Sequence, residues 1–412
     1  MSENSIFVQI ASYRDPQLKY TIRNCLESAK FPHNLKFCIA HQYDMTEDLS
    51  EFENNEQFIF IKIPYKDSKG ACWARNLIQQ KYTDEKYTLQ LDSHHRFIKN
   101  WDIICIDLME QLKSEGIKKP LLTAYLPSFD PENDPEKRQQ QPWKMNFDRF
   151  TPEGVVFFLP AVIEEFENLN RPLPARFYSA HFCFTLGQFC KEVQHDPNYY
   201  FHGEEISIAV RAFTHGYDLF HPHKLIAWHE YTRKGRVKHW DDDTNWGKKN
   251  ANSHLRNRKL FEMDEEKRDI DLEIYGFGTE RTLRDYEEYS GLSFSKRAVQ
   301  QYTLDNKIAP NPVVDDFNQS LLKIFKHCIN INYTQLQETD YDFWVVAFHN
   351  EKDDTIYRKD ADKNEIKNLM NDPDKYCKIW REFNCEQKPK YWVVWPHSES
   401  RGWCDRIVGN LS

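Results

Sequence analysis

The sequence predicts an α/β protein with a mostly parallel sheet covered by helices, followed by a small β-rich domain. Three observations lead to this prediction. The chain has 412 residues, which is more than one hydrophobic core usually organises. Its first third alternates short apolar β-runs with amphipathic helical patterns. Beyond about residue 335 the composition changes, and five of the eleven Trp residues lie after residue 340.

The predicted strands of the first domain are short apolar runs separated by helical patterns. They are Ser5–Ala11, Leu35–His41, Phe58–Ile63 and Tyr87–Leu91. Pro16 marks a helix start, because apolar residues recur at helical spacing from Leu18 to Ala29. A second helical pattern covers Gly70–Tyr82. This alternation favours a parallel sheet with right-handed crossovers.

Polar segments follow three of these strands where the sheet is expected to end. They are Ser12–Asp15, Tyr65–Gly70 and Asp92–His95. In open α/β sheets, ligands bind beyond the carboxyl ends of the strands. We therefore expect one site to collect all three segments.

The remainder of the first domain mixes polar loops with helices. Asp130–Pro142 is polar and Pro-rich and predicts an exposed loop, and Tyr231–Arg258 predicts a mobile one. His202–Thr214 and Glu280–Ser290 predict helices. We place this domain at residues 1–295 and a connecting segment at residues 296–334.

The last domain, expected at residues 335–412, carries a weak internal repeat. An aromatic β-run followed by His and an acid begins at Phe343 and again at Tyr391. This pattern predicts a small β-rich module. Its Trp residues either stack on sugar rings or pack the core of the module, and core packing is the favoured interpretation.

Charge and composition exclude several classes of partner. Lys and Arg number 55 against 64 Asp and Glu, which gives a net charge of −9 and a pI of about 6.0. Because nucleic acids and anionic membranes favour clustered basic residues, we expect no nucleic-acid partner. No apolar run approaches the roughly 20 residues of a transmembrane segment. The polar N-terminus does not resemble a signal peptide, and ten Cys residues without a C-x-x-C pair suit reduced thiols, so we expect a cytoplasmic protein.

Asp92 and His94 form the sharpest motif, two residues apart after the strand Tyr87–Leu91. A carboxylate and an imidazole at a strand end can turn toward one divalent cation. The competing interpretation is a strand-end turn that Asp92 caps. A His on another strand would complete three protein ligands, and we prefer His229, which follows an apolar run, to His223.

Two further groups of residues are candidates for the same site. Glu204 and Glu205 open a predicted helix, where the helix dipole alone also favours carboxylates. The strand-end loop after Ile10 combines an aromatic and a charged side chain, which suits a pyrimidine base and ribose. The candidate nucleotide-binding residues are Ala11, Ser12, Tyr13, Arg14, Asp67, Arg75, Asp92 and Ser93. The competing explanation is an ordinary ion pair of Arg14 with Asp15 or Asp67.

The chain resembles glycosyltransferase family sixty in five ordered blocks, VQIASYRDPQL, GACWARN, LQLDSHHRF, FHGEEISIAVRAFTHGYDLFHP and WHEYTR. The resemblance covers roughly residues 5–295 and includes GTERTLRDYEEYSGLSF at 278–294. Cytoplasmic N-acetylglucosaminyltransferases that modify hydroxyproline typify this family. The chain is also distantly similar to the polypeptide N-acetylgalactosaminyltransferases. Residues 335–412 match no module of either group.

The resemblance implies a GT-A fold, in which a Rossmann-like mixed sheet is flanked by helices. It also implies a UDP-sugar donor, Mn²⁺ (or Mg²⁺) and retention of anomeric configuration. By the match, Asp92, His94 and His229 carry the metal, and Glu204 and Glu205 occupy the catalytic acidic position. The expected activity is transfer of N-acetylglucosamine from UDP-GlcNAc to a hydroxyl of a protein, such as hydroxyproline, or of a glycan. A homodimer is one assembly that we consider.

Three alternatives stay open. The chain could be a transferase that uses another UDP-hexose to build a cell-surface polysaccharide. It could be a catalytically inert carbohydrate-binding protein of the same fold, although the intact metal and acidic residues speak against this. A metal-dependent hydrolase with the same His and Asp residues would leave the ordered blocks unexplained.

Overall fold

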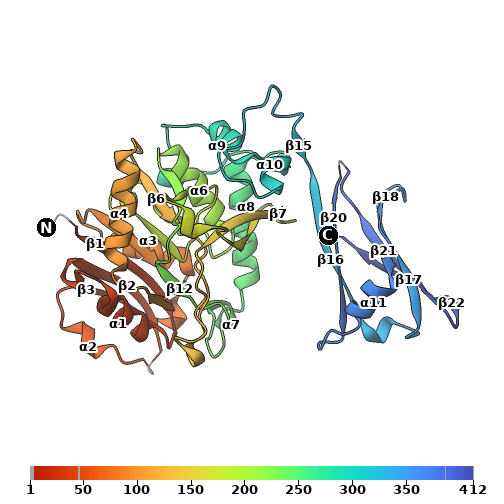
Figure 1. The fold of residues 1–412 in the computed structure, drawn as a ribbon, viewed down its shortest axis with the longest axis horizontal. Coiled ribbons are helices and arrows are strands. Elements are labelled where there is room, and N and C mark those ends of the chain that lie inside the picture. Colours follow the sequence, from red (N-terminus) through yellow and green to blue (C-terminus); the bar gives the residue numbers. More distant parts are fainter. Residues whose placement is uncertain (1–3, 45–46, 386, 412) are drawn as a thin grey trace. The chain divides into compact units, whose positions relative to one another are not determined.

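The computed structural model describes residues 4–44, 47–385 and 387–411. The chain divides into two compact units, and the boundary lies between Gln319 and Ser320 (Figure 1). The first unit is a mixed α/β structure, and the second is rich in β-strands. The predicted fold class, a Rossmann-like mixed sheet flanked by helices with a small C-terminal β-rich domain, is confirmed.

An eight-stranded sheet forms the centre of the first unit. Its strands are β1 (Ile6–Tyr13), β2 (Leu35–Tyr43), β3 (Phe58–Pro64), β4 (Tyr87–Leu91), β6 (Pro120–Thr123), β9 (Leu173–Pro174), β10 (Phe182–Leu186) and β11 (Asp218–His221). They lie in the order β3-β2-β1-β4-β10-β6-β11-β9. The first four are parallel, and β10 runs antiparallel between β4 and β6. Because β2 and β4 lie on opposite sides of β1, the strand order reverses at β1 and β4, where ligands bind in such sheets.

The described part of the first unit contains ten α-helices. They are α1 (Leu18–Ser28), α2 (Ser50–Glu53), α3 (Ala71–Gln79), α4 (Trp101–Ser114), α5 (Phe189–Glu192), α6 (Glu204–Thr214), α7 (His239–Asp242), α8 (Trp246–Phe261), α9 (Leu283–Ser290) and α10 (Gln301–Leu304). Within the described ranges, every helix is too short or too polar to span a lipid bilayer.

The sheet is buried on both faces, which explains the continuous apolar runs of its strands. On one face, Ile10 and Ile39 pack with residues of α1 and α4. On the other face, Phe7 and Ala40 pack with Ala74 and Ile78 of α3. Successive side chains of a strand point to opposite faces, so neither face can be polar. Packing of helices on both faces therefore holds β1 and β2 in place.

Short antiparallel pairs complete the first unit. They are β5 (His95–Phe97) with β12 (Ala227–His229), β7 (Trp143–Phe150) with β8 (Val156–Val162), and β13 (Leu292–Ser293) with β14 (Ala298–Gln300). The pairing with β12 is made by β5, which closely follows the carboxyl end of β4 in the chain. It therefore brings a segment from the far part of the unit to the site edge of the sheet.

The described residues of the second unit form β-strands, most of them in antiparallel pairs, and one α-helix. Its elements are β15 (Leu321–Leu322), β16 (Ile324–Asn332), β17 (Tyr341–His349), β18 (Thr355–Arg358), β19 (Ala361–Asp362), α11 (Lys363–Leu369), β20 (Tyr376–Asn384), β21 (Tyr391–Ser398), β22 (Gly402–Trp403) and β23 (Ile407–Asn410). β16 pairs with β20, and β17 pairs with β18, β19 and β21. β21 also pairs with β22 and β23.

A separate hydrophobic core holds the second unit together. Trp344 and Val346 of β17 and Val394 of β21 are fully buried in it. Gly409 lies opposite Trp392 in the sheet, and a Cβ there would lie 2.2 Å from the indole. Glycine is therefore required at this position by close approach rather than by backbone conformation.

Two segments differ from the elements expected from the sequence. The mobile loop expected over Tyr231–Arg258 is wrong in part, because α7 and most of α8 form there. The segment is polar in composition, but one side of α8, which includes Ser253, Asn257 and Phe261, is buried. The expected connecting segment 296–334 contains β16, which pairs along its length with β20 of the second unit.

Candidate active site

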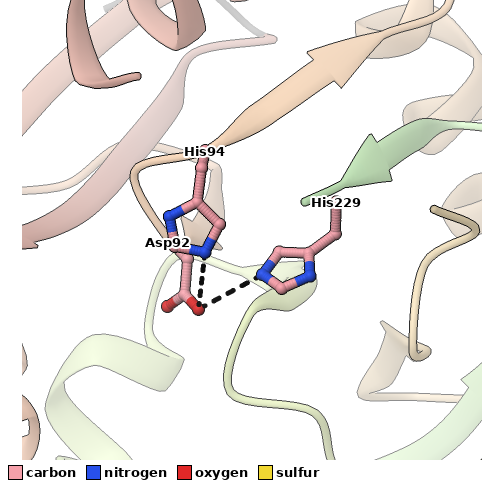
Figure 2. A group of neighbouring side chains, drawn as sticks. All are labelled: Asp92, His94 and His229. Atoms are coloured by element: carbon pink, nitrogen blue, oxygen red, sulfur yellow. Dashed lines mark ion pairs between the residues drawn. The ribbon is translucent and has the colours of Figure 1, made fainter. Parts of the chain in front are cut away.

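Three side chains converge beyond the carboxyl end of β4. Asp92 follows β4, His94 lies two residues later, and His229 ends β12. One ligand atom of each lies within 4.8 Å of the others (Figure 2). Asp92 Oδ2 is 3.5 Å from His229 Nε2 and 3.8 Å from His94 Nε2. The structure thus brings together the predicted metal ligands, and this group contains His229 and not His223.

Strand pairing sets the two imidazoles beside each other. β5 begins immediately after His94, and its antiparallel register with β12 places His95 opposite His229. The rings of His94 and His229 have centroids 4.7 Å apart. His181 of the neighbouring segment stacks on the other side of the cluster, with its centroid 4.2 Å from that of His229. His95 ends the segment Asp92–His95 without a predicted role of its own, and His181 stands in none of the predicted motifs.

The three side chains fit a divalent cation. His229 Nε2 is buried without a hydrogen-bond partner, and such a polar atom is costly unless another partner satisfies it. Two ligands that each lie about 2.1 Å from one ion are separated by roughly 3–3.5 Å. The 3.5 Å between His229 Nε2 and Asp92 Oδ2 agrees with this spacing. A carboxylate with two imidazoles is a donor set for divalent transition metals.

Asp15, at the end of β1, positions His94. Its Oδ2 lies 2.7 Å from His94 Nδ1 and accepts a hydrogen bond of 2.7 Å from Ser93 Oγ. Arg236 contacts both His94 and Asp15, the latter at 3.2 Å. Asp15 and Arg236 both contact Nδ1 of this ring, so Nε2 is the nitrogen that faces Asp92 and is left to bind a cation. The sequence shows Asp15 only as part of a strand-end segment and gives no signal for this role.

Neighbouring charges keep the cluster in the form that binds metal. Burial opposes ionisation of Asp92, but His229 and the Arg75 guanidinium outweigh it and hold the pKa of this carboxyl well below its usual value. Arg75 Nη2 donates a hydrogen bond of 2.9 Å to Asp92 Oδ1. Burial lowers the pKa of His229 to about 4. An anionic carboxylate and a neutral imidazole are the protonation states that bind metal ions.

Arg75 is placed by the start of α3. The helix begins after Gly70, whose φ is +110° and whose Cβ, if present, would lie 2.6 Å from the Tyr200 carbonyl oxygen. Only glycine meets both conditions without strain. Arg75 Nε and Nη1 are buried without hydrogen-bond partners. The guanidinium therefore keeps unused donors beside the cluster.

Glu204 and Glu205 lie in the first turn of α6. Glu204 Oε1 is 3.6 Å from Arg75 Nη1, so this carboxylate faces the same guanidinium as Asp92. Glu205 accepts hydrogen bonds from the Ala180 backbone N–H at 2.8 Å and from the Tyr125 hydroxyl at 3.0 Å. Burial raises the pKa of both carboxyls. Perturbed carboxyls beside a cation site are candidates for acid–base or orienting roles.

A cavity of about 160 Å³ lies over the cluster. One of its walls is residues 231–243, which we call the strap. Three basic side chains of the strap, Arg233, Arg236 and Lys238, line the cavity. Asp242 ties the strap to the end of β1, because it accepts hydrogen bonds from the Tyr13 hydroxyl at 2.8 Å and from Arg14 Nη1 at 2.7 Å.

The remaining predicted residues divide into those that line this cavity and those that lie outside its lining. The first group comprises Ala11, Tyr13, Arg75, Asp92, Ser93, His94 and His229. The second group comprises Ser12, Arg14, Asp67, Glu204 and Glu205. Asp67 is exposed in the helical turn Tyr65–Asp67, and Arg14 pairs with Asp44 and Asp242 instead of Asp15 or Asp67. Glu205 lines a smaller cavity of about 40 Å³ together with Tyr125.

Comparison with protein families gives one clear result. The family model described as glycosyltransferase (GlcNAc) matches residues 5–57 and 46–296. These ranges contain the whole cluster and the strap and end before the second unit. Comparison with curated protein sequences gives no match.

Several solved glycosyltransferase structures have a similar chain course. GalNAc-T7 with UDP, GalNAc and Mn²⁺ is 12% identical with a TM-score of 0.47, and 62% of this chain matches 48% of that one, about half its length. S. aureus TarS is 11% identical to this chain with a TM-score of 0.38, and 99% of this chain matches 77% of that one. The Pyrobaculum calidifontis mannosyltransferase PcManGT with GDP-Man and Mn²⁺ is 8% identical with a TM-score of 0.37, and 56% of this chain matches 58% of that one. At these identities and scores the likeness assigns no donor or acceptor.

Proposed function

The chain belongs to the glycosyltransferase (GlcNAc) family, and on this premise we propose that it transfers N-acetylglucosamine from UDP-GlcNAc to a hydroxyl acceptor. The observation that carries the proposal is the cluster of Asp92, His94 and His229 beside a cavity with three basic side chains. This arrangement combines a cation site with a positively charged wall for a diphosphate.

Asp92, His94 and His229 hold one divalent cation in this proposal, Mn²⁺ or Mg²⁺. When bound, the cation neutralises the charge that develops on the leaving diphosphate. The protein supplies the orientation of the ligands. Asp15 fixes the ring of His94 through Nδ1, and Arg75 keeps Asp92 ionised and in place.

The nucleotide lies at the end of β1, with uracil against Ala11 and Tyr13 and the diphosphate near Arg233 and Arg236. The cavity of about 160 Å³ is smaller than the 300–1,000 Å³ typical of small-molecule sites. The strap therefore moves outward to admit the donor and afterwards closes to exclude water. Arg14 contributes indirectly, because it binds Asp242 of the strap.

Retention requires that the acceptor oxygen attack C1 from the face of the leaving group, or that a covalent intermediate form on Glu204 or Glu205. We favour the first route. The bond from C1 to the UDP oxygen breaks, the acceptor oxygen bonds to C1, and the acceptor proton passes to a phosphate oxygen of UDP. Glu205 orients the acceptor hydroxyl in this proposal, and the acceptor enters through the smaller cavity that Glu205 and Tyr125 line. Glu204 instead faces Arg75.

The acceptor is a hydroxyl of a protein, such as hydroxyproline, or of a glycan. Ten free Cys residues favour a reducing compartment, and we place the reaction in the cytoplasm. The alternative within the same class is a transferase that uses another UDP-hexose.

The decisive experiment measures UDP release from a panel of nucleotide sugars, with hydroxyproline peptides and oligosaccharides as acceptors. It compares Mn²⁺ with chelator and the wild type with Asp92→Ala. Asp84→Ala is the matched control, because the Asp84 side chain is 74% exposed in the loop before β4. We expect Mn²⁺-dependent turnover of UDP-GlcNAc that falls by about 10²–10³-fold or more in Asp92→Ala and stays unchanged in Asp84→Ala.

The outcomes separate the parts of the proposal. Turnover that is indifferent to chelator and to Asp92→Ala would contradict the cation site. Preference for another UDP-hexose would overturn the donor but leave the reaction class. Absence of turnover, together with absence of donor binding by calorimetry, would make the chain a carbohydrate-binding protein of this fold.

A further inference from the structure

The second unit carries a cluster of aromatic side chains on the outer face of its sheet. We call it the aromatic platform, and it consists of Phe343, Trp395, His397 and Trp403. Phe343 of β17 lies opposite His397 of β21, and His397 lies opposite Trp403 of β22. Trp395 stands two residues before His397, so all four side chains leave the same face of the sheet. The residues of opposite parity, such as Trp344, form the buried core.

The rings of the platform contact one another and stay accessible. The indoles of Trp395 and Trp403 have centroids 4.2 Å apart with planes tilted by 32°. Phe343 stacks on His397 at 5.0 Å, and both rings meet Trp403 edge-on. Trp403 is nevertheless 46% exposed. Trp344, which follows Phe343 and points to the opposite face of the sheet, is fully buried. Core packing therefore accounts for Trp344 but not for Trp403.

Polar groups border the platform and fix its rings. The His397 ring Nδ1 lies 2.8 Å and 3.0 Å from the two carboxylate oxygens of Asp342. Trp395 Nε1 donates a hydrogen bond of 2.9 Å to the Cys404 carbonyl. The Arg406 guanidinium carbon lies 4.0 Å from the Trp395 centroid. The border therefore offers carboxylate acceptors from Asp342 and guanidinium donors from Arg406.

The size of the platform argues against a second copy of the chain as its occupant. A Trp side chain buries at most about 250 Å², so 46% exposure of Trp403 corresponds to roughly 115 Å². The three other rings are partly covered and bring the total to a few hundred Å² at most. A stable protein interface needs about 800 Å² from each partner. Flat apolar rings with a few polar groups at the border suit a small ligand instead.

We propose that the aromatic platform binds a neutral oligosaccharide. The apolar C–H face of a pyranose ring would lie against Trp403, whose ring face carries partial negative charge. Sugar hydroxyls would exchange hydrogen bonds with the Asp342–His397 pair and with Arg406. This inference concerns the second unit alone, and it stands whether or not the proposed donor chemistry is correct.

The test measures binding by calorimetry to the full chain, without nucleotide sugar, using chitotetraose, cellotetraose and maltotetraose as probes. Trp403→Ala is compared with Trp380→Ala, because Trp380 is 51% exposed on β20 and lies outside the platform. We expect at least one probe to bind the wild type, with affinity at least about tenfold lower in Trp403→Ala and unchanged in Trp380→Ala. Trp403→Phe keeps a flat ring and should retain most of the affinity.

Each other result overturns the proposal. These results are absence of binding of all three probes at millimolar concentration, equal losses in Trp403→Ala and Trp380→Ala, or a dimer seen by sedimentation that requires Trp403 while no probe binds. Circular dichroism of the variants verifies folding. UDP release is recorded on the same samples and should not change in Trp403→Ala, so failure of the donor chemistry is distinguished from failure of the platform.

Discussion

The candidate active site of the first unit and the aromatic platform of the second unit differ in how far their functional groups are exposed to solvent. In the first unit the polar side chains of the site are buried, with Asp15 only 4% and His229 7% exposed. In the second unit the polar groups border an indole that is 46% exposed. Burial strengthens electrostatic interactions and excludes water, which a group-transfer reaction requires. An exposed aromatic ring suits reversible recognition. The two proposals together assign reaction to the first unit and recognition to the second.

Glu205→Gln has the largest expected effect of the three substitutions. The amide keeps the size of the side chain and an oxygen for the Ala180 N–H, but it removes the ionisable carboxyl that we propose orients the acceptor. We expect kcat for transfer to fall by about 10²–10³-fold with little change in donor affinity. Stopped assays of UDP release with acceptor measure this. Glu288→Gln, on the exposed side of α9, is the control. Equal losses in transfer and in oligosaccharide binding would contradict the division between the units.

Asp15→Asn tests whether the buried carboxylate serves the cation site. The amide oxygen can still accept from Ser93, but the negative charge beside His94 is lost. We expect Mn²⁺ affinity to fall by about 10–100-fold, because outer partners of metal-binding His residues have effects of this size. Electron paramagnetic resonance of free Mn²⁺ during titration measures the affinity. Asp48→Asn is the control, since its side chain is 73% exposed. Unchanged Mn²⁺ affinity would show that Asp15 has only a structural role.

Asp242→Ala has the smallest expected effect and examines the strap. Its ion pair with Arg14 is partly exposed, and pairs of this kind contribute at most about 1 kcal/mol. We expect donor KM to change by no more than about fivefold, while hydrolysis of the donor by water rises because the strap is open more often. Initial rates with and without acceptor measure both. Asp84→Ala, an exposed Asp outside the strap, is the control. A loss above tenfold in transfer would place Asp242 in the reaction itself.

Much of the first unit was predictable because its signals are local. The apolar runs at Leu35–His41 and Tyr87–Leu91 match strands β2 and β4, since a strand covered on both faces needs no polar positions. The motif of Asp92 and His94 was readable because both residues follow one strand. The helices within Tyr231–Arg258 were missed, because α7 buries no side chain and the residues that α8 buries before Arg258 are the polar Ser253, His254 and Asn257, which give no apolar period.

Long-range relations could not be predicted in the same way. Asp15 and His94 meet because β1 and β4 are neighbours in the sheet. Glu205 finds its partners Tyr125 and Ala180 through the packing of α6. Nothing in the sequence near Glu205 records either contact. Only the order of the strands and the packing of the helices produce them.

The amino-acid sequence by itself determined the alternation of strands and helices, the chemistry of the candidate ligands and the change of composition toward the second unit. These properties depend on neighbouring residues, because periodicity and strand ends are set within a few positions of the chain. The tertiary structure decided that His229 rather than His223 joins Asp92 and His94, that Asp15 backs His94, and that Trp403 stays exposed while Trp344 is buried. Those outcomes depend on strand register, in which a shift of one residue reverses the face of every side chain.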